Sequence, residues 1–209
     1  MNYFLMHISD VLQATVQHLL LTGATLGIAL VIALPVGFLL ARKGKAASGV
    51  IAVLNVLYSI PSMAMFVLLI PLLGLGFAPA VTALVIYSQF VLVRNIVIGF
   101  RRNDPAILEA GAAMGMTRWQ LFSRIEFPLA LPVILGGVRI ACISIIGIAT
   151  IASWINAGGL GTLLFNGLYQ DNTGEIITGT VFVSVLAILC NQFIYALENR
   201  ASRHAQGIY

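Results

Sequence analysis

The stretch that decides the fold runs from Asp104 to Pro132 and reads DPAILEAGAAMGMTRWQLFSRIEFPLALP. It is the only long polar segment between hydrophobic ones. Asp104 can cap a helix that has Pro105 at its first position, where a missing N–H costs nothing. Good helix formers follow, and Gly115 is the residue best able to end that helix in a left-handed conformation. The first half of the stretch therefore predicts a short helix followed by a hinge.

A second short helix is predicted after the hinge. Thr117 and Gln120 have the spacing of a capping box, in which each side chain bonds to the backbone N–H of the other residue. The helix would continue from Arg118 to Ile125. Phe127-Pro128 is expected to end it, because a residue that precedes proline disfavours the helical conformation. The whole stretch is thus expected to form a compact polar elbow.

The composition indicates a membrane protein. Of the 209 residues, 60% are hydrophobic and 9% are charged, and the mean hydropathy is +1.01. A soluble core of this size cannot bury so much apolar surface. A helix needs about 20 residues to cross the hydrocarbon core. The stretches of sufficient length are 19–41, 50–73, 78–99, 129–154 and 176–197. We therefore expect an all-α integral membrane protein with five transmembrane helices.

The eleven basic residues orient these helices. Arg139 is inside the fourth predicted span. The other ten lie in three places: between the first and second spans, at or within the segment that joins the third and fourth spans, and after the fifth span. Positive residues mark the cytoplasmic side, so the N-terminus is predicted outside and the C-terminus inside. The predicted divisions are a periplasmic or interfacial lead (1–18), a transmembrane domain (19–198) with a cytoplasmic coupling loop (100–128), and a cytoplasmic tail (199–209).

Two predicted spans carry polar side chains that indicate a translocation path. The candidates are Tyr58, Ser59 and Ser62 in the second span, and Tyr87 and Gln89 in the third. Polar groups at membrane depth normally face other protein or a water-filled path. A helix broken at Pro61 would widen such a path. The alternative is that the hydroxyl groups bond to backbone groups freed by this proline.

Other polar features have structural interpretations. Arg94 can extend to the cytoplasmic interface, and Arg139 is expected to act as an anchor there. The outer loop, 154–175, is too apolar for a free loop and too rich in glycine for a spanning helix. It is expected to form a re-entrant or lid-like segment at the outer mouth.

Several classes of function are not indicated. The chain has neither a GxxxxGK[ST] nor an HExxH pattern, so nothing in it predicts an enzyme. Cys142 and Cys190 fall inside predicted spans and are interpreted as packing residues, with no metal site. The net charge of +4 is spread along membrane edges and has no interleaved aromatics, so nucleic acid is not an expected partner.

The elbow is similar to the EAA loop of bacterial ABC importer permeases. That loop reads Glu-Ala-Ala, three residues, Gly, nine residues, Ile, any residue, Leu-Pro. The matching residues here are Glu109-Ala110-Gly111, Gly115, Ile125 and Phe127-Pro128, with Gly111 in place of Ala and Phe127 in place of Leu. The resemblance implies that a cytoplasmic ATPase subunit docks on this loop. The coupling residues would be Glu109, Ala110, Gly111, Gly115, Ile125 and Pro128.

Three further stretches narrow the resemblance: LYSIPSMAMFVLLIPLLGLGFAPAVTAL, LVRNIVIGF and INAGGLG. They are similar to permease subunits of glycine betaine, choline and carnitine importers, which are osmoprotectant transporters. Methionine importer permeases are the nearest competitor. A membrane scaffold without transport is the alternative from another class.

The resemblance implies a type I ABC importer transmembrane domain in the bacterial cytoplasmic (inner) membrane, surrounded by the lipid bilayer. Its expected partners are ABC ATPase subunits, a second permease subunit, identical or sister, and a periplasmic or lipid-anchored solute-binding protein. ATP and Mg would be held by the ATPase, so no cofactor is expected on this chain.

Overall fold

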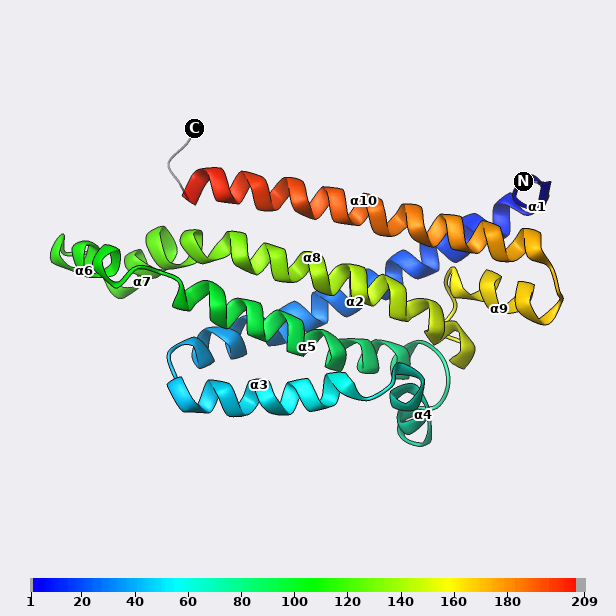
Figure 1. The fold of residues 1–209 in the computed structure, drawn as a ribbon, viewed down its shortest axis with the longest axis horizontal. Helices are drawn as coiled ribbons and strands as arrows, with labels where there is room; N and C mark the ends of the chain where they lie inside the picture. The colour runs from blue at the N-terminus through cyan, green and yellow to red at the C-terminus, as the bar shows by residue number, and fades with distance from the viewer. Residues whose placement is uncertain (1, 206–209) are drawn as a thin grey trace.

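A computed structural model describes residues 2–205, and every regular element within that range is a helix. Figure 1 shows the long helices running side by side. In chain order the elements are α1 (Asn2–Met6), α2 (Ile8–Ala41), α3 (Gly44–Ser59), α4 (Ser62–Leu73), α5 (Phe77–Arg101), α6 (Pro105–Ala113), α7 (Arg118–Leu121), the π-helix η1 (Phe122–Glu126), α8 (Phe127–Ala152), the short 3-10 helix η2 (Ser153–Ile155), α9 (Gly161–Tyr169) and α10 (Thr173–Ala205).

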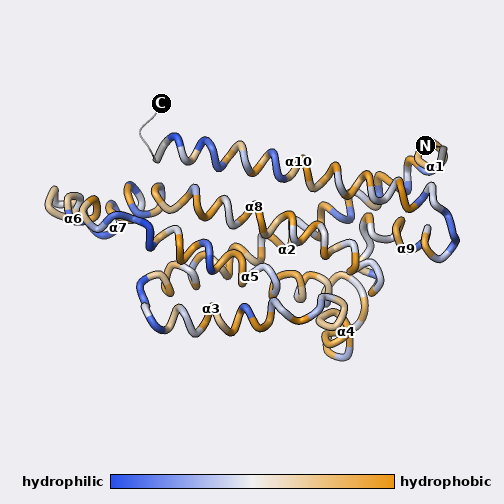
Figure 2. Tube along the Cα trace, viewed as in Figure 1, coloured by the Kyte–Doolittle hydropathy of each residue, from blue (hydrophilic) through white to orange (hydrophobic). Residues whose placement is uncertain are grey.

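α5 is the innermost helix of the bundle. It packs against α2, α3, α4 and α8, and 56% of its most apolar stretch is buried. α10 lies on the outside, against α8 and α9, and only 11% of the corresponding stretch is buried. Large apolar side chains between Ile177 and Leu197 are exposed on it, as expected of a helix that faces lipid, and hydrophilic residues are more frequent toward its C-terminal end (Figure 2).

The number of helices able to cross a membrane agrees with the expected fold. Four single helical runs qualify: α2, α5, the run from Arg118 to Ile155, and α10. α3 and α4 together make a fifth if they count as one span, and they are bent by 93° at the break between them. The break falls at Pro61, whose ring prevents a continuous helix.

The helices at both ends of the chain are longer than the predicted spans. α2 begins at Ile8, so most of the predicted lead 1–18 is helical and continuous with the first span. α10 runs to Ala205, so the tail is helical up to that residue. Met1 of the lead and residues 206–209 of the tail lie outside the described residues.

Glycines allow the central helices to approach closely. A Cβ on Gly37 of α2 would lie 2.5 Å from the Ile96 side chain of α5. A Cβ on Gly137 of α8 would lie 2.5 Å from the Cβ of Asn95, also on α5. Small residues at such contacts are typical of helix packing in membranes, where close van der Waals contact replaces the hydrophobic effect as the driving force.

Basic residues hold one end of the bundle together. Arg101, at the end of α5, donates hydrogen bonds to the carbonyl groups of Ala41 at 3.1 Å and Lys43 at 3.3 Å. Arg42 forms an ion pair with Glu126 at 3.0 Å. The elbow (α6 and α7) and the C-terminal end of α10 lie at this end, and the N-terminus lies at the other (Figure 1). Positive residues mark the cytoplasmic side, so the elbow faces the cytoplasm.

Candidate functional site

The elbow folds as two short capped helices. The Asp104 carboxylate accepts a hydrogen bond from the Ala106 backbone N–H at 2.9 Å, at the start of α6. Gly115, just after α6, has a φ of +79°. Thr117 and Gln120 form the capping box of α7, with bonds of 2.8 and 3.3 Å. The predicted helix, hinge and second helix start are confirmed.

The prediction that Phe127-Pro128 ends the second helix is wrong. After α7 the chain stays helical through η1 into α8. Pro128 lies in the first turn of α8, and in a regular α-helix its ring would meet the carbonyl four residues back. The π-helix widens the backbone here, since the Phe127 N–H bonds to the Phe122 carbonyl five residues back. The elbow is therefore continuous with a spanning helix.

Gly111 occupies the inner corner of the elbow. It is buried, and a Cβ there would lie 2.8 Å from Leu121 Cδ1 and 2.9 Å from Ile125 Cδ1. α6 thus packs closely on the helix that follows the hinge, and the structure brings the predicted coupling residues Gly111 and Ile125 together. The other four predicted coupling residues lie apart from this corner. Pro128 is half-buried, and the remaining three residues, Glu109, Ala110 and Gly115, are exposed.

Apolar side chains are exposed on the elbow. The exposed fractions are 44% for Ile107, 71% for Met114 and 71% for Trp119. We call these three residues the apolar elbow surface. The elbow helices α6 and α7 lie at one end of the bundle (Figure 1), and exposed apolar groups beside polar ones mark protein contacts. The sequence alone did not single out Ile107 and Met114, because apolar residues in a short helix do not show which side faces solvent.

An aromatic cluster joins the elbow to the bundle. The Phe122 ring lies 5.0 Å from Phe38, 6.1 Å from Phe100, 5.7 Å from Trp119 and 5.9 Å from Phe127, measured between ring centroids. These partners come from α2, α5, α7 and α8 respectively. We call the five residues the Phe122 cluster. The sequence gives little signal for it, because Phe38 and Phe100 come from helices that are far from the elbow along the chain.

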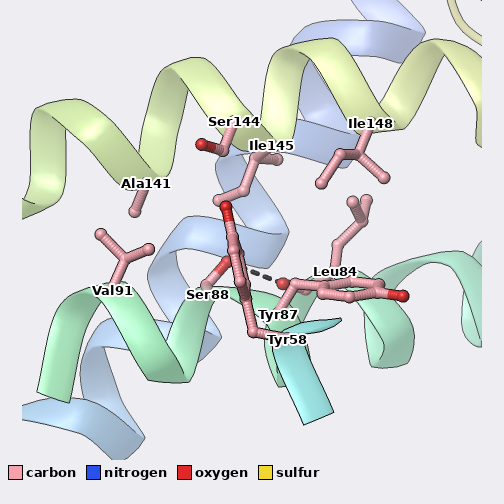
Figure 3. Close-up of a pocket in the computed structure, with 9 residues that line it drawn as sticks. All are labelled: Tyr58, Leu84, Tyr87, Ser88, Val91, Ala141, Ser144, Ile145 and Ile148. Carbon is pink, nitrogen blue, oxygen red and sulfur yellow. Dashed lines mark hydrogen bonds between the residues drawn. The ribbon is translucent and has the colours of Figure 1, made fainter. Parts of the chain in front are cut away.

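Tyr58 and Tyr87, two of the predicted path residues, meet at a small cavity between α3, α5 and α8 (Figure 3). Their ring centroids are 6.0 Å apart, at 79° to one another. The cavity measures about 10 Å³, close to the size of one water molecule. Ser88 and Ser144 also line it. This arrangement is a closed contact and has no room for a solute.

The Tyr87 hydroxyl satisfies a backbone carbonyl at the break between α3 and α4. It donates a hydrogen bond of 2.6 Å to the Ile60 carbonyl, next to Pro61. The Ser59 hydroxyl bonds to the Val56 carbonyl at 2.7 Å. For these two residues the structure favours the alternative in which hydroxyl groups satisfy backbone freed at the proline.

The two remaining path candidates lie elsewhere. Gln89, on α5, faces α2 and not the Tyr58–Tyr87 contact. Its amide donates a hydrogen bond to the Ala29 carbonyl of α2 at 3.2 Å. Ser62 is half-buried at the start of α4. The predicted path residues thus separate into a Tyr58–Tyr87 contact and positions that support the backbone or face another helix.

Residues suited to metal or cofactor chemistry do not gather in the described part of the chain. Between residues 2 and 205, no group of three or more His, Cys, Asp or Glu side chains is arranged to hold a metal ion. His18 is fully buried between α2 and α8, with Nε2 3.1 Å from the Ile146 carbonyl, while Nδ1 accepts from the Leu160 N–H at 3.3 Å. It joins three segments of the fold.

Known permeases are similar to this chain over almost its whole length. The chain is 39% identical to the carnitine transport permease protein OpuCB of Listeria monocytogenes, over 94% of this chain and 90% of that protein. It is 37% identical to the glycine betaine/carnitine/choline transport system permease protein OpuCB of Bacillus subtilis, over 92% and 89%.

A solved structure has the same fold. The MetNI methionine ABC transporter in an inward-facing conformation matches with a TM-score of 0.82 and 24% identity, over 93% of this chain and 97% of that one. At this identity the likeness concerns the fold alone. The sequence pattern of the family described as binding-protein-dependent transport system inner membrane component matches residues 33–204. This chain therefore belongs to that family of ABC transporter permeases.

Proposed function

We propose that this permease imports quaternary ammonium osmoprotectants, with glycine betaine, carnitine and choline as the candidate solutes. Relatives that carry these solutes in their names match about nine-tenths of the chain at 37% and 39% identity. This similarity over almost the whole chain is the observation that carries the proposal. The capped elbow at the basic end of the bundle, continuous with the spanning helix α8, supports the coupling part of the scheme.

The elbow is the proposed docking site for a separate ATPase subunit, which holds ATP and Mg. Glu109 is exposed for contact with a polar partner group, and the apolar elbow surface supplies area that becomes buried on docking. Gly115 sets the angle between α6 and α7 through its left-handed backbone. Ile125, Gly111 and Pro128 fix the elbow to η1 and α8.

Movement of the elbow would pass into the bundle as rigid-body motion of helices. When the ATPase subunits close, they would pull α6 and α7, and η1 would transmit the displacement to α8 without a flexible joint. The Phe122 cluster adds lateral contact with α2 and α5. The chain itself performs no hydrolysis in this scheme.

A second permease subunit and a binding protein complete the proposed importer. The face of α3 and α5 is the proposed side of the path, because Asn55 and Arg94 expose polar groups there that lipid cannot satisfy. A second subunit on this face would enclose them. The binding protein would deliver solute at the opposite end from the elbow, where α4 and α9 lie (Figure 1).

A methionine importer is the second candidate, because the sequence resemblance left it as the nearest competitor and a methionine transporter shares the fold. The osmoprotectant relatives are more similar in sequence, at 37% and 39% against 24%. A scaffold without transport is less consistent with the family, whose description is that of a transport system component.

Uptake of labelled solutes tests the proposal. Cells that lack their own importers would express this chain with its ATPase and binding protein, and receive glycine betaine, choline, carnitine or methionine. The variants are Glu109→Lys on the elbow and, as a matched control, Asn199→Lys, an exposed position on α10 outside the elbow.

We expect a quaternary amine to accumulate in cells with the parent and the control. Glu109→Lys should insert in the membrane but lose uptake by about tenfold or more, because a reversed charge at a docking surface opposes association. Accumulation of methionine alone would leave the coupling scheme intact and refute the proposal that the solute is a quaternary ammonium compound. Equal uptake by Glu109→Lys and the parent would refute docking through Glu109.

A further inference from the structure

A pocket of about 390 Å³ lies between α3 and α5, beside the Tyr58–Tyr87 contact. It is lined by Ser48, Ile51, Ala52, Asn55, Phe90 and Arg94. The volume is within the usual range for small-molecule sites, in contrast to the closed cavity of Figure 3. The pocket opens on the α3–α5 face, the side assigned above to the path.

Arg94 does not take the position expected from the sequence. An arginine near a helix end was expected to extend toward the cytoplasmic interface. Its guanidinium carbon instead lies 5.9 Å from the ring centroid of Phe90, one helical turn back toward the middle of α5. Side chains on a helix lean toward its N-terminus, and here that direction leads away from the basic end. Arg94 is seven residues, or about 10 Å, from the end of α5 at Arg101.

Arg94 lacks a charged partner in the described part of the chain. Between residues 2 and 205 its guanidinium forms neither an ion pair nor a hydrogen bond, and its contact is with the Phe90 ring. The other intramembrane arginine, Arg139, is paired with Glu198 at 3.0 Å. An arginine at this depth without an acidic partner is a candidate functional group, and its five donors fit a carboxylate.

One aromatic ring, that of Phe90, lines the pocket beside the guanidinium, and the Tyr58 ring packs against it. The Tyr58 and Phe90 ring centroids are 5.1 Å apart, and Tyr58 also contacts Tyr87. Ring faces attract a quaternary ammonium group through cation–π interaction. A carboxylate-binding cation and an ammonium-binding aromatic ring therefore lie side by side on the proposed path.

We propose that this pocket is a binding site for zwitterionic solutes that carry both a quaternary ammonium and a carboxylate, and that Arg94 selects for the carboxylate. The inference rests on the proposed function. Arg94 would bind the carboxylate while Phe90, held in place by the packed Tyr58 ring, contacts the ammonium group. Glycine betaine and carnitine have both groups. Choline has no carboxylate, so Arg94 offers it only repulsion between like charges.

The test compares initial uptake of labelled glycine betaine and choline in the same cells. The variants are Arg94→Gln, which removes the charge, and Arg94→Lys, which keeps it. Arg203→Gln is the control, because it removes an exposed arginine of α10 that neither lines this pocket nor belongs to the loop 100–128. Each rate is divided by the amount of permease in the membrane, so that a loss of folding is not read as a loss of transport. The uptake rate of each variant is then divided by the parent's rate for the same solute, because this ratio cancels any preference of the binding protein between the two solutes.

Arg94→Gln is expected to lower glycine betaine uptake by about tenfold or more, the scale of a lost hydrogen bond to a charged group, while choline uptake stays within about twofold or rises. Arg94→Lys should restore part of the glycine betaine uptake. If both solutes fall alike, or if neither changes, the selectivity role of Arg94 is refuted although the proposed function stands. If the parent accumulates neither of these solutes nor carnitine, the proposed function fails and this inference fails with it.

Discussion

Gly115 controls the elbow through its backbone alone. Its φ is +79°, and no atom lies within 4 Å of where a Cβ would be, so a side chain there meets no clash. Gly115→Ala should still cost about 1–2 kcal/mol, because the left-handed conformation is unfavourable for residues with a Cβ. We expect weaker ATPase docking and lower uptake. The measurement is co-purification of the ATPase with each variant, together with the uptake rate.

Gly115→Asn is the matched control, since asparagine tolerates the left-handed region better than alanine does. It should keep more docking than Gly115→Ala despite its larger side chain. If the two variants lose docking in the order of side-chain size instead, backbone conformation is not what Gly115 supplies.

Gly111 and Gly115 show what the sequence can predict about single residues. Gly115 follows a run of helix formers and precedes a capping box, so its role as a helix terminator was predictable from local pattern. The burial of Gly111 depends on Leu121 and Ile125, which contact it only after the hinge has folded back. Both contacts involve the ends of flexible side chains, so the alanine usual in the family fits there after a small shift.

The break between α3 and α4 makes a prediction at the scale of helices. The Tyr87 hydroxyl donates to the Ile60 carbonyl at 2.6 Å, and Tyr87 is only 4% exposed. Tyr87→Phe leaves this carbonyl without its donor and should lower the unfolding free energy by about 1 kcal/mol. Thermal unfolding of the purified protein in detergent measures the change.

Tyr58→Phe is the control for this variant. Tyr58 contacts the same cavity, but its hydroxyl has no hydrogen-bond partner among the residues that the structure describes. Its removal should change the unfolding temperature less than the removal of the Tyr87 hydroxyl. Equal effects would mean that the bond to Ile60 does not stabilise the bend.

Two prolines that were both expected to end a helix, Pro61 and Pro128, have different effects on the backbone, and only the effect of Pro61 was predicted. Pro61 breaks its helix, with a bend of 93° that no sequence pattern specifies. Pro128 was expected to do the same, but η1 absorbs it and the helix continues. The Phe122 cluster packs against η1 from α2 and α5, and such tertiary contacts are not visible in local sequence.

At the scale of the whole molecule, composition and the distribution of charge were enough to predict a helical membrane protein with a cytoplasmic elbow. Hydropathy sets the number of spans and basic residues set their direction. The path is harder to predict, because a polar residue in a span can face solute, backbone or another helix. Gln89 turned toward α2 and Arg94 toward Phe90, and only packing decides between these directions.

The connection between the elbow and the bundle gives the last prediction. Phe122 contacts Phe38 and Phe100 across the junction, so Phe122→Ala should weaken the link while leaving the apolar elbow surface in place. We expect ATP hydrolysis to continue and the ratio of solute imported to ATP hydrolysed to fall by about fivefold or more, corresponding to about 1 kcal/mol of lost coupling. Both rates are measured in proteoliposomes. Phe193→Ala removes an exposed ring of α10, away from this junction and from the end where solute is delivered, and should leave the ratio unchanged. If Phe122→Ala lowers hydrolysis and import in proportion, the cluster supports docking or folding and does not transmit movement.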